Sequence, residues 1–111
     1  MTGLPNSSTA YVEQKKITQY LLNLAHKEGG PKARFFLSHG FTVEDWKGLH
    51  DALVAQGQGN PVVKVVESGF GKRYTVQCKC PAPSQKDPCI RSVWEIQTAG
   101  SPPRLITAHP V

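Results

Sequence analysis

The spacing of apolar residues predicts an amphipathic helix near the start of the chain. Between about residues 12 and 26, side chains recur three, four and seven positions apart: Ile17, Tyr20, Leu21 and Leu24. This period matches the 3.6 residues of a helical turn. The glycine pair at 29–30 and Pro31 end the pattern, because both residue types interrupt helices. Residues 32–37 are expected to form a short strand or an extended link.

A second helix is predicted to begin near Thr42 and to end at Gly57. The Thr42 hydroxyl can cap its first turn, where acidic residues at 44 and 45 suit the positive end of the helix dipole. Its apolar stripe consists of Trp46, Leu49 and Leu53. These three side chains are expected to contact a sheet.

Beyond residue 61 the apolar pattern changes to the period of two that is typical of strands. Four strands are expected, at residues 62–66, 72–80, 90–97 and 104–109. The proline-rich residues 81–88 are expected to form an exposed loop. Helices followed by consecutive strands indicate an α+β fold. We therefore predict one domain over residues 1–111, in which two N-terminal helices pack on one face of an antiparallel sheet. The sheet has four strands, or five if residues 32–37 join it, and residues 1–11 are expected to be extended or mobile.

Charge narrows the choice of partners. The chain has 13 Lys and Arg against 8 Asp and Glu, which gives a formal net charge of +5. This balance favours a polyanionic partner, either nucleic acid or an acidic protein. No apolar run approaches the roughly 20 residues of a membrane span, and residues 1–12 lack the features of a signal peptide. We expect a soluble protein without a membrane partner.

The three cysteines bear on metal binding and on the cellular compartment. Cys78 and Cys80 lie two apart in a predicted strand, so both are expected on one buried face. The spacing differs from that of common zinc sites, and an odd number of cysteines, with Cys89, does not suit a disulfide framework. We predict reduced cysteines, no metal site and a reducing, cytoplasmic environment.

The last predicted strand carries the residues best suited to chemistry. Leu105, Thr107 and His109 are expected on one face, because alternate side chains of a strand point the same way. Thr107 and His109 would lie about 7 Å apart at their backbones. A hydroxyl and an imidazole at this distance can bind phosphate and transfer protons. The alternative interpretation is that both are ordinary polar residues at the edge of a sheet.

Further candidates are basic or aromatic. Arg91, on the strand expected next to the last one, can bind phosphate through two N–H groups at once. Candidate substrate-binding residues are Lys72, Arg73 and Tyr74 at the start of the long strand, and Lys32 and Arg34 beside the double glycine. His39 is an alternative catalytic imidazole. The structural alternatives are solvated strand-end charges for the basic residues and a core position for Tyr74.

Several segments resemble a bacterial and phage family of unknown function over nearly the whole chain. They include Leu4-Pro5-Asn6, Gly29-Gly30, Tyr74-Thr75-Val76, Arg91-Ser92-Val93-Trp94 and Pro103-Arg104-Leu105-Ile106-Thr107-Ala108. In that family the last segment usually continues with Tyr-Pro, whereas here His109 takes the tyrosine position.

The same closing segment is similar to the end of bacterial ribonuclease toxin domains of the EndoU-like, RelE-like and colicin types. That resemblance implies N-terminal helices on a four-stranded antiparallel sheet with catalytic groups on the sheet face. It implies cleavage of RNA, with tRNA as one candidate, by attack of the 2′-hydroxyl without metal or other cofactor. His109, Thr107 and Arg91 would be catalytic, and an acidic immunity or antitoxin protein would be the partner. The alternatives are a non-enzymatic basic module that binds an acidic protein or a phage assembly, and, less favoured, a nucleic-acid-binding regulator.

Overall fold

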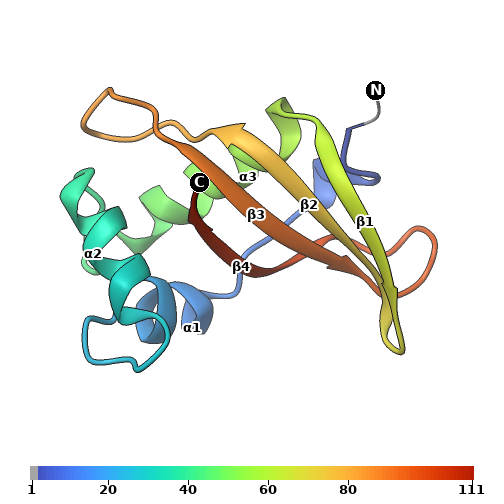
Figure 1. Cartoon of the computed structure of the whole chain (residues 1–111), viewed down its shortest axis with the longest axis horizontal. Coiled ribbons are helices and arrows are strands. Elements are labelled where there is room, and N and C mark those ends of the chain that lie inside the picture. Colours follow the sequence, from blue (N-terminus) through green and yellow to red (C-terminus); the bar gives the residue numbers. More distant parts are fainter. Residues whose placement is uncertain (1–2) are drawn as a thin grey trace.

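A four-stranded antiparallel sheet forms the second half of the molecule (Figure 1). The computed structural model describes residues 3–111. The strands are β1 (Val62–Ser68), β2 (Gly71–Lys79), β3 (Cys89–Ile96) and β4 (Arg104–Pro110), and they pair in chain order. The α+β fold and all four predicted strands are confirmed. Within residues 3–111 the sheet has no fifth strand.

The helices precede the sheet. They are the 3-10 helix η1 (Ser7–Thr9), α1 (Gln14–Lys16), the π-helix η2 (Ile17–Leu21), α2 (Gly30–Ser38) and α3 (Trp46–Gly59). In Figure 1, α3 lies behind the sheet, whereas α1 and α2 lie beside it, next to β4. None of the helices in residues 3–111 is long and apolar enough to cross a membrane.

The predictions for the segments before α3 need correction. Residues 32–37 are helical, because Pro31 occupies the first turn of α2, where its missing N–H costs nothing, and Ala33 and Phe36 bury one side. The helix predicted for residues 12–26 is shorter and ends at Leu21. Turns connect η2 to α2. The glycine pair therefore lies between two helices and also begins the second one.

Helix α3 packs on the sheet much as its apolar stripe predicted. Leu49 and Leu53 are fully buried, and Trp46 is half-buried against the same core. The predicted start near Thr42 is wrong, because the helix begins at Trp46. The Thr42 hydroxyl accepts a hydrogen bond from the backbone N–H of Asp45 in the turn before the helix, so it does not cap the first helical turn. The helix continues past the predicted end at Gly57 as far as Gly59, and Gly57 is buried against the indole of Trp94 on β3.

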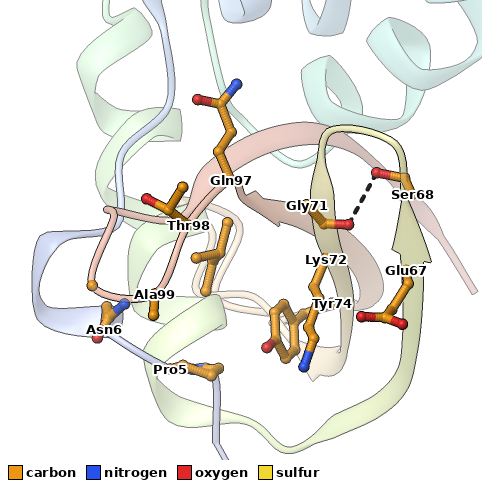
Figure 2. A pocket seen from close by; sticks show the side chains of 12 residues that line it. Pro5, Asn6, Glu67, Ser68, Gly71, Lys72, Tyr74, Gln97, Thr98 and Ala99 are labelled. Carbon is orange, nitrogen blue, oxygen red and sulfur yellow. Dashed lines mark hydrogen bonds between the residues drawn. The ribbon is translucent and has the colours of Figure 1, made fainter.

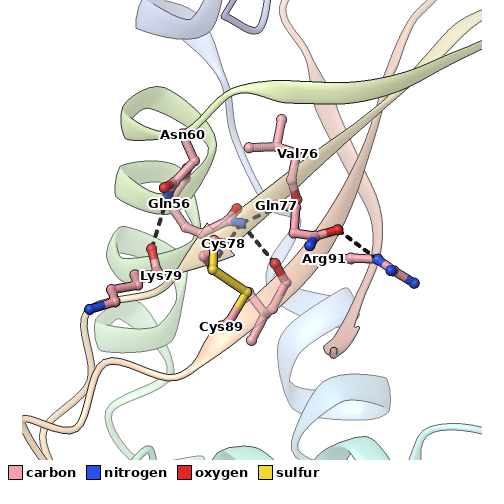
Figure 3. Close-up of a disulfide and its surroundings, with 9 residues drawn as sticks. Gln56, Asn60, Val76, Gln77, Cys78, Lys79, Cys89 and Arg91 are labelled. Atoms are coloured by element: carbon pink, nitrogen blue, oxygen red, sulfur yellow. Dashed lines mark hydrogen bonds between the residues drawn. A yellow bond between two sulfur atoms is a disulfide. The ribbon is translucent and has the colours of Figure 1, made fainter.

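Gln56 is a fully buried polar residue at the contact between α3 and the sheet (Figure 3). Its amide nitrogen donates to the carbonyl oxygens of Val76 at 3.2 Å and Ile90 at 3.3 Å. Its amide oxygen accepts a hydrogen bond from the Ser92 hydroxyl, which in turn accepts the indole N–H of Trp94 at 2.7 Å. This satisfied network fixes α3 against both central strands, because an unpaired buried polar group would be costly.

A β-bulge changes the direction of side chains in β4. Val93 pairs with Thr107 and Trp94 pairs with Leu105, so Ile106 is the extra residue. Leu105 and Ala108 are therefore both buried, while Thr107 and His109 point to the other face. The prediction that Thr107 and His109 share a face is confirmed. The prediction that Leu105 shares it is wrong, because the bulge reverses the alternation.

Cys78 and Cys89 form a disulfide between the ends of β2 and β3 (Figure 3). The prediction that Cys78 is reduced is therefore wrong. The two cysteines become neighbours only when β2 and β3 pair, with Cys78 opposite Ile90 and Cys89 opposite Lys79. Cys80 is a buried free thiol, as predicted, and its burial raises its pKa to about 12.

The packing of Gly57 against Trp94 predicts opposite effects for two glycines of α3. A Cβ atom on Gly57 would lie 2.8 Å from the indole, whereas one on Gly59 would meet nothing within 4 Å. We expect Gly57→Ala to lower the free energy of unfolding by about 1–3 kcal/mol through overpacking. Gly59→Ala should leave it unchanged or raise it by up to about 1 kcal/mol. Urea denaturation measures both, and equal effects would contradict the contact.

The disulfide predicts one reactive thiol in the oxidised, unfolded protein, that of Cys80. Reduction should lower the free energy of unfolding by about 2–3 kcal/mol, because it releases a closed loop of the denatured chain. Cys78→Ser combined with Cys89→Ser should reproduce the loss and make the protein insensitive to reductant. Three titratable thiols without reductant would contradict the pairing.

Candidate active site

Arg91 and His109 lie directly opposite each other on β3 and β4. Both are on the face of the sheet away from α3, since the alternate residues Ile90 and Ser92 are buried beneath it. They line a hollow of about 530 Å³ that continues across the face to Thr75 and Lys64. The sequence-based expectation that these two residues lie on neighbouring strands is confirmed.

Thr107 belongs to an adjoining cluster on the helical side. Its hydroxyl lies 3.1 Å from the hydroxyl of Tyr20, which also accepts a hydrogen bond of 2.7 Å from the Lys32 ammonium. The ammonium nitrogens of Lys32 and Lys16 lie 5.0 and 5.4 Å from the centroid of the Tyr20 ring. Two helical segments and the last strand thus meet at one phenol.

The pKa of Tyr20 lies below its ordinary value of 10.0. Partial burial alone would raise it, but hydrogen bonds with Lys32 and Thr107 and the charges of Lys32 and Lys16 together outweigh burial. Tyr20 therefore releases a proton more readily than a solvated tyrosine. It can act as a proton donor to a substrate oxygen near Thr107.

The pKa of His109 is also lowered from 6.5. Burial contributes most, followed by repulsion from the positive charges of Lys32 and Arg91. The lowered pKa of His109 favours the neutral imidazole, the form that can accept a proton. Lys32 connects the cluster around Tyr20 with the pair of Arg91 and His109. Its ammonium binds the Tyr20 hydroxyl and lies close enough to His109 to repel a positive charge there.

Tyr20 is held in place by a backbone contact that depends on glycine. A side chain on Gly29 would collide with the Tyr20 carbonyl and lie 2.9 Å from its ring. The His26 ring packs edge-on against Tyr20 with centroids 4.9 Å apart. Its Nδ1 atom accepts the N–H groups of Glu28 and Gly29, so His26 shapes the turn that carries Gly29.

The predicted substrate-binding residues of β2 do not join this site. Arg73 pairs with the buried carboxylate of Glu95 at 3.3 Å, and Arg104 reaches the same carboxylate at 3.0 Å. Lys72 and Tyr74 point to the opposite face, because they alternate with Arg73. They line a separate groove of about 520 Å³ at the turn between β1 and β2 (Figure 2).

The remaining candidates also separate. Arg34 is exposed on α2, and within residues 3–111 it makes no hydrogen bond or ion pair through its side chain. His39 lies at the far end of α2 from Lys32, where its Nδ1 atom is 3.0 Å from the Ser84 hydroxyl and its ring packs on Phe35. Among the described residues, no group of three or more His, Cys, Asp or Glu side chains could hold a metal ion.

Sequence reasoning missed Tyr20 and Lys16 as site residues. Tyr20 fits the apolar stripe of a helix, and this concealed its polar end. The signal that could have found it is the pair of lysines at 16 and 32 near a tyrosine, but their proximity depends on the turn between η2 and α2.

The chain belongs to a family described as a domain of unknown function, DUF6883, whose model matches residues 3–111. A comparison with curated proteins finds no significant match. The fold is similar to a chain from a solved structure titled as a contact-dependent growth inhibition toxin–immunity protein complex from Klebsiella pneumoniae 342. The TM-score is 0.70 at 18% sequence identity, over 95% of this chain and 96% of that chain. At this identity the likeness is one of fold.

Because Lys32 affects both Tyr20 and His109, replacing it should change the pKa values of both residues. Lys32→Met should raise the pKa of Tyr20, which loses a hydrogen bond and a positive charge, and should raise the pKa of His109, which loses a repulsive charge. Arg34→Met removes an exposed cation from the same helix and should change neither value. NMR titration of the His109 and Tyr20 rings measures both. Unchanged pKa values in Lys32→Met would show that the clusters are independent.

Proposed function

We propose that this domain is a toxin-type endoribonuclease that cleaves RNA without a metal ion, by attack of the 2′-hydroxyl on the neighbouring phosphate. The observation that carries the proposal is the meeting of a neutral imidazole, a phenol of lowered pKa and several cations on one surface. Such cleavage needs a base, an acid and positive charge around the phosphate. The site offers each of these.

In the proposed reaction, His109 takes the proton of the 2′-hydroxyl as its oxygen forms a bond to phosphorus. The bond from phosphorus to the 5′-oxygen breaks, and Tyr20 donates its proton to this leaving oxygen. The products are a 2′,3′-cyclic phosphate and a free 5′-hydroxyl. Lys32 stabilises the phenolate that remains, because its ammonium already donates to the Tyr20 oxygen.

Positive charge in the site favours the transition state over the ground state. The Arg91 guanidinium, opposite His109, suits the two non-bridging oxygens of a phosphate. The Thr107 hydroxyl lies 3.1 Å from the Tyr20 hydroxyl. It can form a hydrogen bond with a phosphate that is bound beside these two groups. Negative charge that develops on these oxygens would be stabilised by groups held in place before the reaction.

The proposed biological role is that of an antibacterial toxin that acts in the bacterial cytoplasm, with tRNA as a candidate substrate. The similar solved structure holds a toxin and an immunity protein, and the net charge of +5 favours the toxin role for this chain. A neutralising partner would then be acidic, because opposite charges speed association and favour the correct partner. The alternative, a binding module without activity, predicts no RNA cleavage.

Expression of the domain without a partner should stop bacterial growth and degrade RNA. His109→Ala should lower the cleavage rate by about 10²–10⁴-fold, as is typical for loss of a general base. Arg91→Ala should lower it by about 10²–10³-fold through loss of transition-state stabilisation. His50→Ala is the matched control, because His50 bonds Asp51 on α3. If the wild-type domain is harmless and leaves RNA intact with and without chelator, the binding-module alternative replaces the proposal.

The cleavage rate should also depend on pH as expected for a general base that is active only in its neutral form. The rate should rise with pH through an inflection below 6.5, where folded His109 loses its proton, and then level off. Lys32→Met should move this inflection to higher pH, because it removes a positive charge that faces His109. Initial rates on a short RNA between pH 4.5 and 8 measure both. An inflection that does not move in Lys32→Met would assign this pH dependence to another group.

A further inference from the structure

The hollow beside Arg91 and His109 extends further than a phosphate requires. It measures about 530 Å³ and crosses the open face of the sheet as far as β1. Clefts of this size hold small organic molecules. The proposed reaction uses only the part of it at Arg91 and His109, so the part that extends to β1 has no assigned role.

The lining of this hollow combines apolar and polar groups in the way that a nucleobase requires. Val63 and Val93 supply apolar surface, and Thr75 and Gln77 supply groups that can hydrogen-bond. A base has flat apolar faces and a polar edge, and proteins read its edge with amide and hydroxyl side chains. Val93 and Thr75 are cross-strand neighbours and are half-buried, so this surface is built into the sheet.

Gln77 is oriented by its neighbour. The Arg91 Nε–H donates to the Gln77 amide oxygen at 2.9 Å, and Figure 3 shows this contact. Arginine has no acceptor, so the bond fixes which end of the amide faces it. The Gln77 NH2 group therefore points away from Arg91, with two donors available for a ligand. Gln56, by contrast, uses its NH2 group entirely within the fold.

We propose that this hollow is the nucleobase subsite of the enzyme, and that Gln77 and Thr75 determine which base precedes the cleaved bond. The inference rests on the proposed function and names its substrate contact. His109 lines the hollow and would bind the attacking 2′-hydroxyl, so the base on that same ribose lies over Gln77 and Thr75. The Gln77 NH2 group donates to a ring nitrogen or carbonyl oxygen of the base, and the Thr75 hydroxyl donates or accepts.

Two substitutions separate base recognition from mere support of Arg91. Gln77→Glu keeps an oxygen that accepts the Arg91 N–H but loses both donors to the base. Gln77→Leu loses both functions. If Gln77 only positions Arg91, Gln77→Glu should affect all substrates alike and Gln77→Leu should be the more damaging change. Gln97→Leu, at an exposed position beyond the end of β3, is the matched control for folding and solubility.

The first measurement uses four DNA oligonucleotides, each with one ribonucleotide bearing A, C, G or U. The wild type should prefer one or two bases. Gln77→Glu and Thr75→Val should change the ratio between best and worst substrates on the order of tenfold, the effect of one hydrogen bond. Gln97→Leu should preserve the ratio. An equal loss on all four substrates in both variants would overturn the inference while leaving the proposed nuclease intact.

The second measurement does not require activity. In His109→Ala protein, nucleoside 3′-monophosphates of the four bases should shift the NMR signals of the Gln77 side-chain amide, with different affinities for different bases. Inorganic phosphate should shift Arg91 without shifting the Gln77 NH2 signals. If the wild-type protein cleaves no RNA but the His109→Ala protein binds nucleotides in this way, the proposed function is rejected and the nucleobase site is kept. If no nucleotide shifts the Gln77 amide, the subsite is rejected.

Discussion

The buried amide of Gln56 determines which face of the sheet is closed and which is open. It bonds carbonyl groups of β2 and β3 and the Ser92 hydroxyl, so α3 cannot slide or rotate without leaving polar groups unpaired in the core. With α3 fixed on one face, the other remains available to a ligand. Trp94 completes the network through Ser92 and fills the space against Gly57, so packing and hydrogen bonding select the same arrangement.

The bulge in β4 then directs Thr107 and His109 to the open face. Without the extra residue at Ile106, a strand with Leu105 buried would also bury Thr107 and His109. Because of the bulge, Leu105 and Ala108 of this strand both point into the core. Thr107, which lies between them, and His109, which follows them, point to the candidate site. Bulges often occur next to active sites for this reason.

Much of the sheet could be predicted from the sequence, because period-two patterns between proline- and glycine-rich turns are local signals. Hairpin order predicted neighbouring strands for Arg91 and His109, whereas the register that sets them opposite each other is known only from the structure. The helical state of residues 32–37 was missed because a glycine pair before Pro31 suits both a break and a helix start. The Cys78–Cys89 bond and the role of Tyr20 were missed because each depends on strand register or on packing between distant segments.

The hydrogen bond between Tyr20 and Thr107 joins residues that are 87 positions apart. The acid of the proposed reaction belongs to the helical layer and the base to the edge strand, so the two work together only while α2 packs on β4 and Tyr20 of η2 reaches Thr107. The same layer supplies Ile17, Leu21 and Phe36 to the core that it shares with α3 and the sheet, so its separation would both disrupt the proposed site and expose buried apolar surface. The proposed function and the stability of the fold therefore depend on the same contact between the helical layer and the last strand.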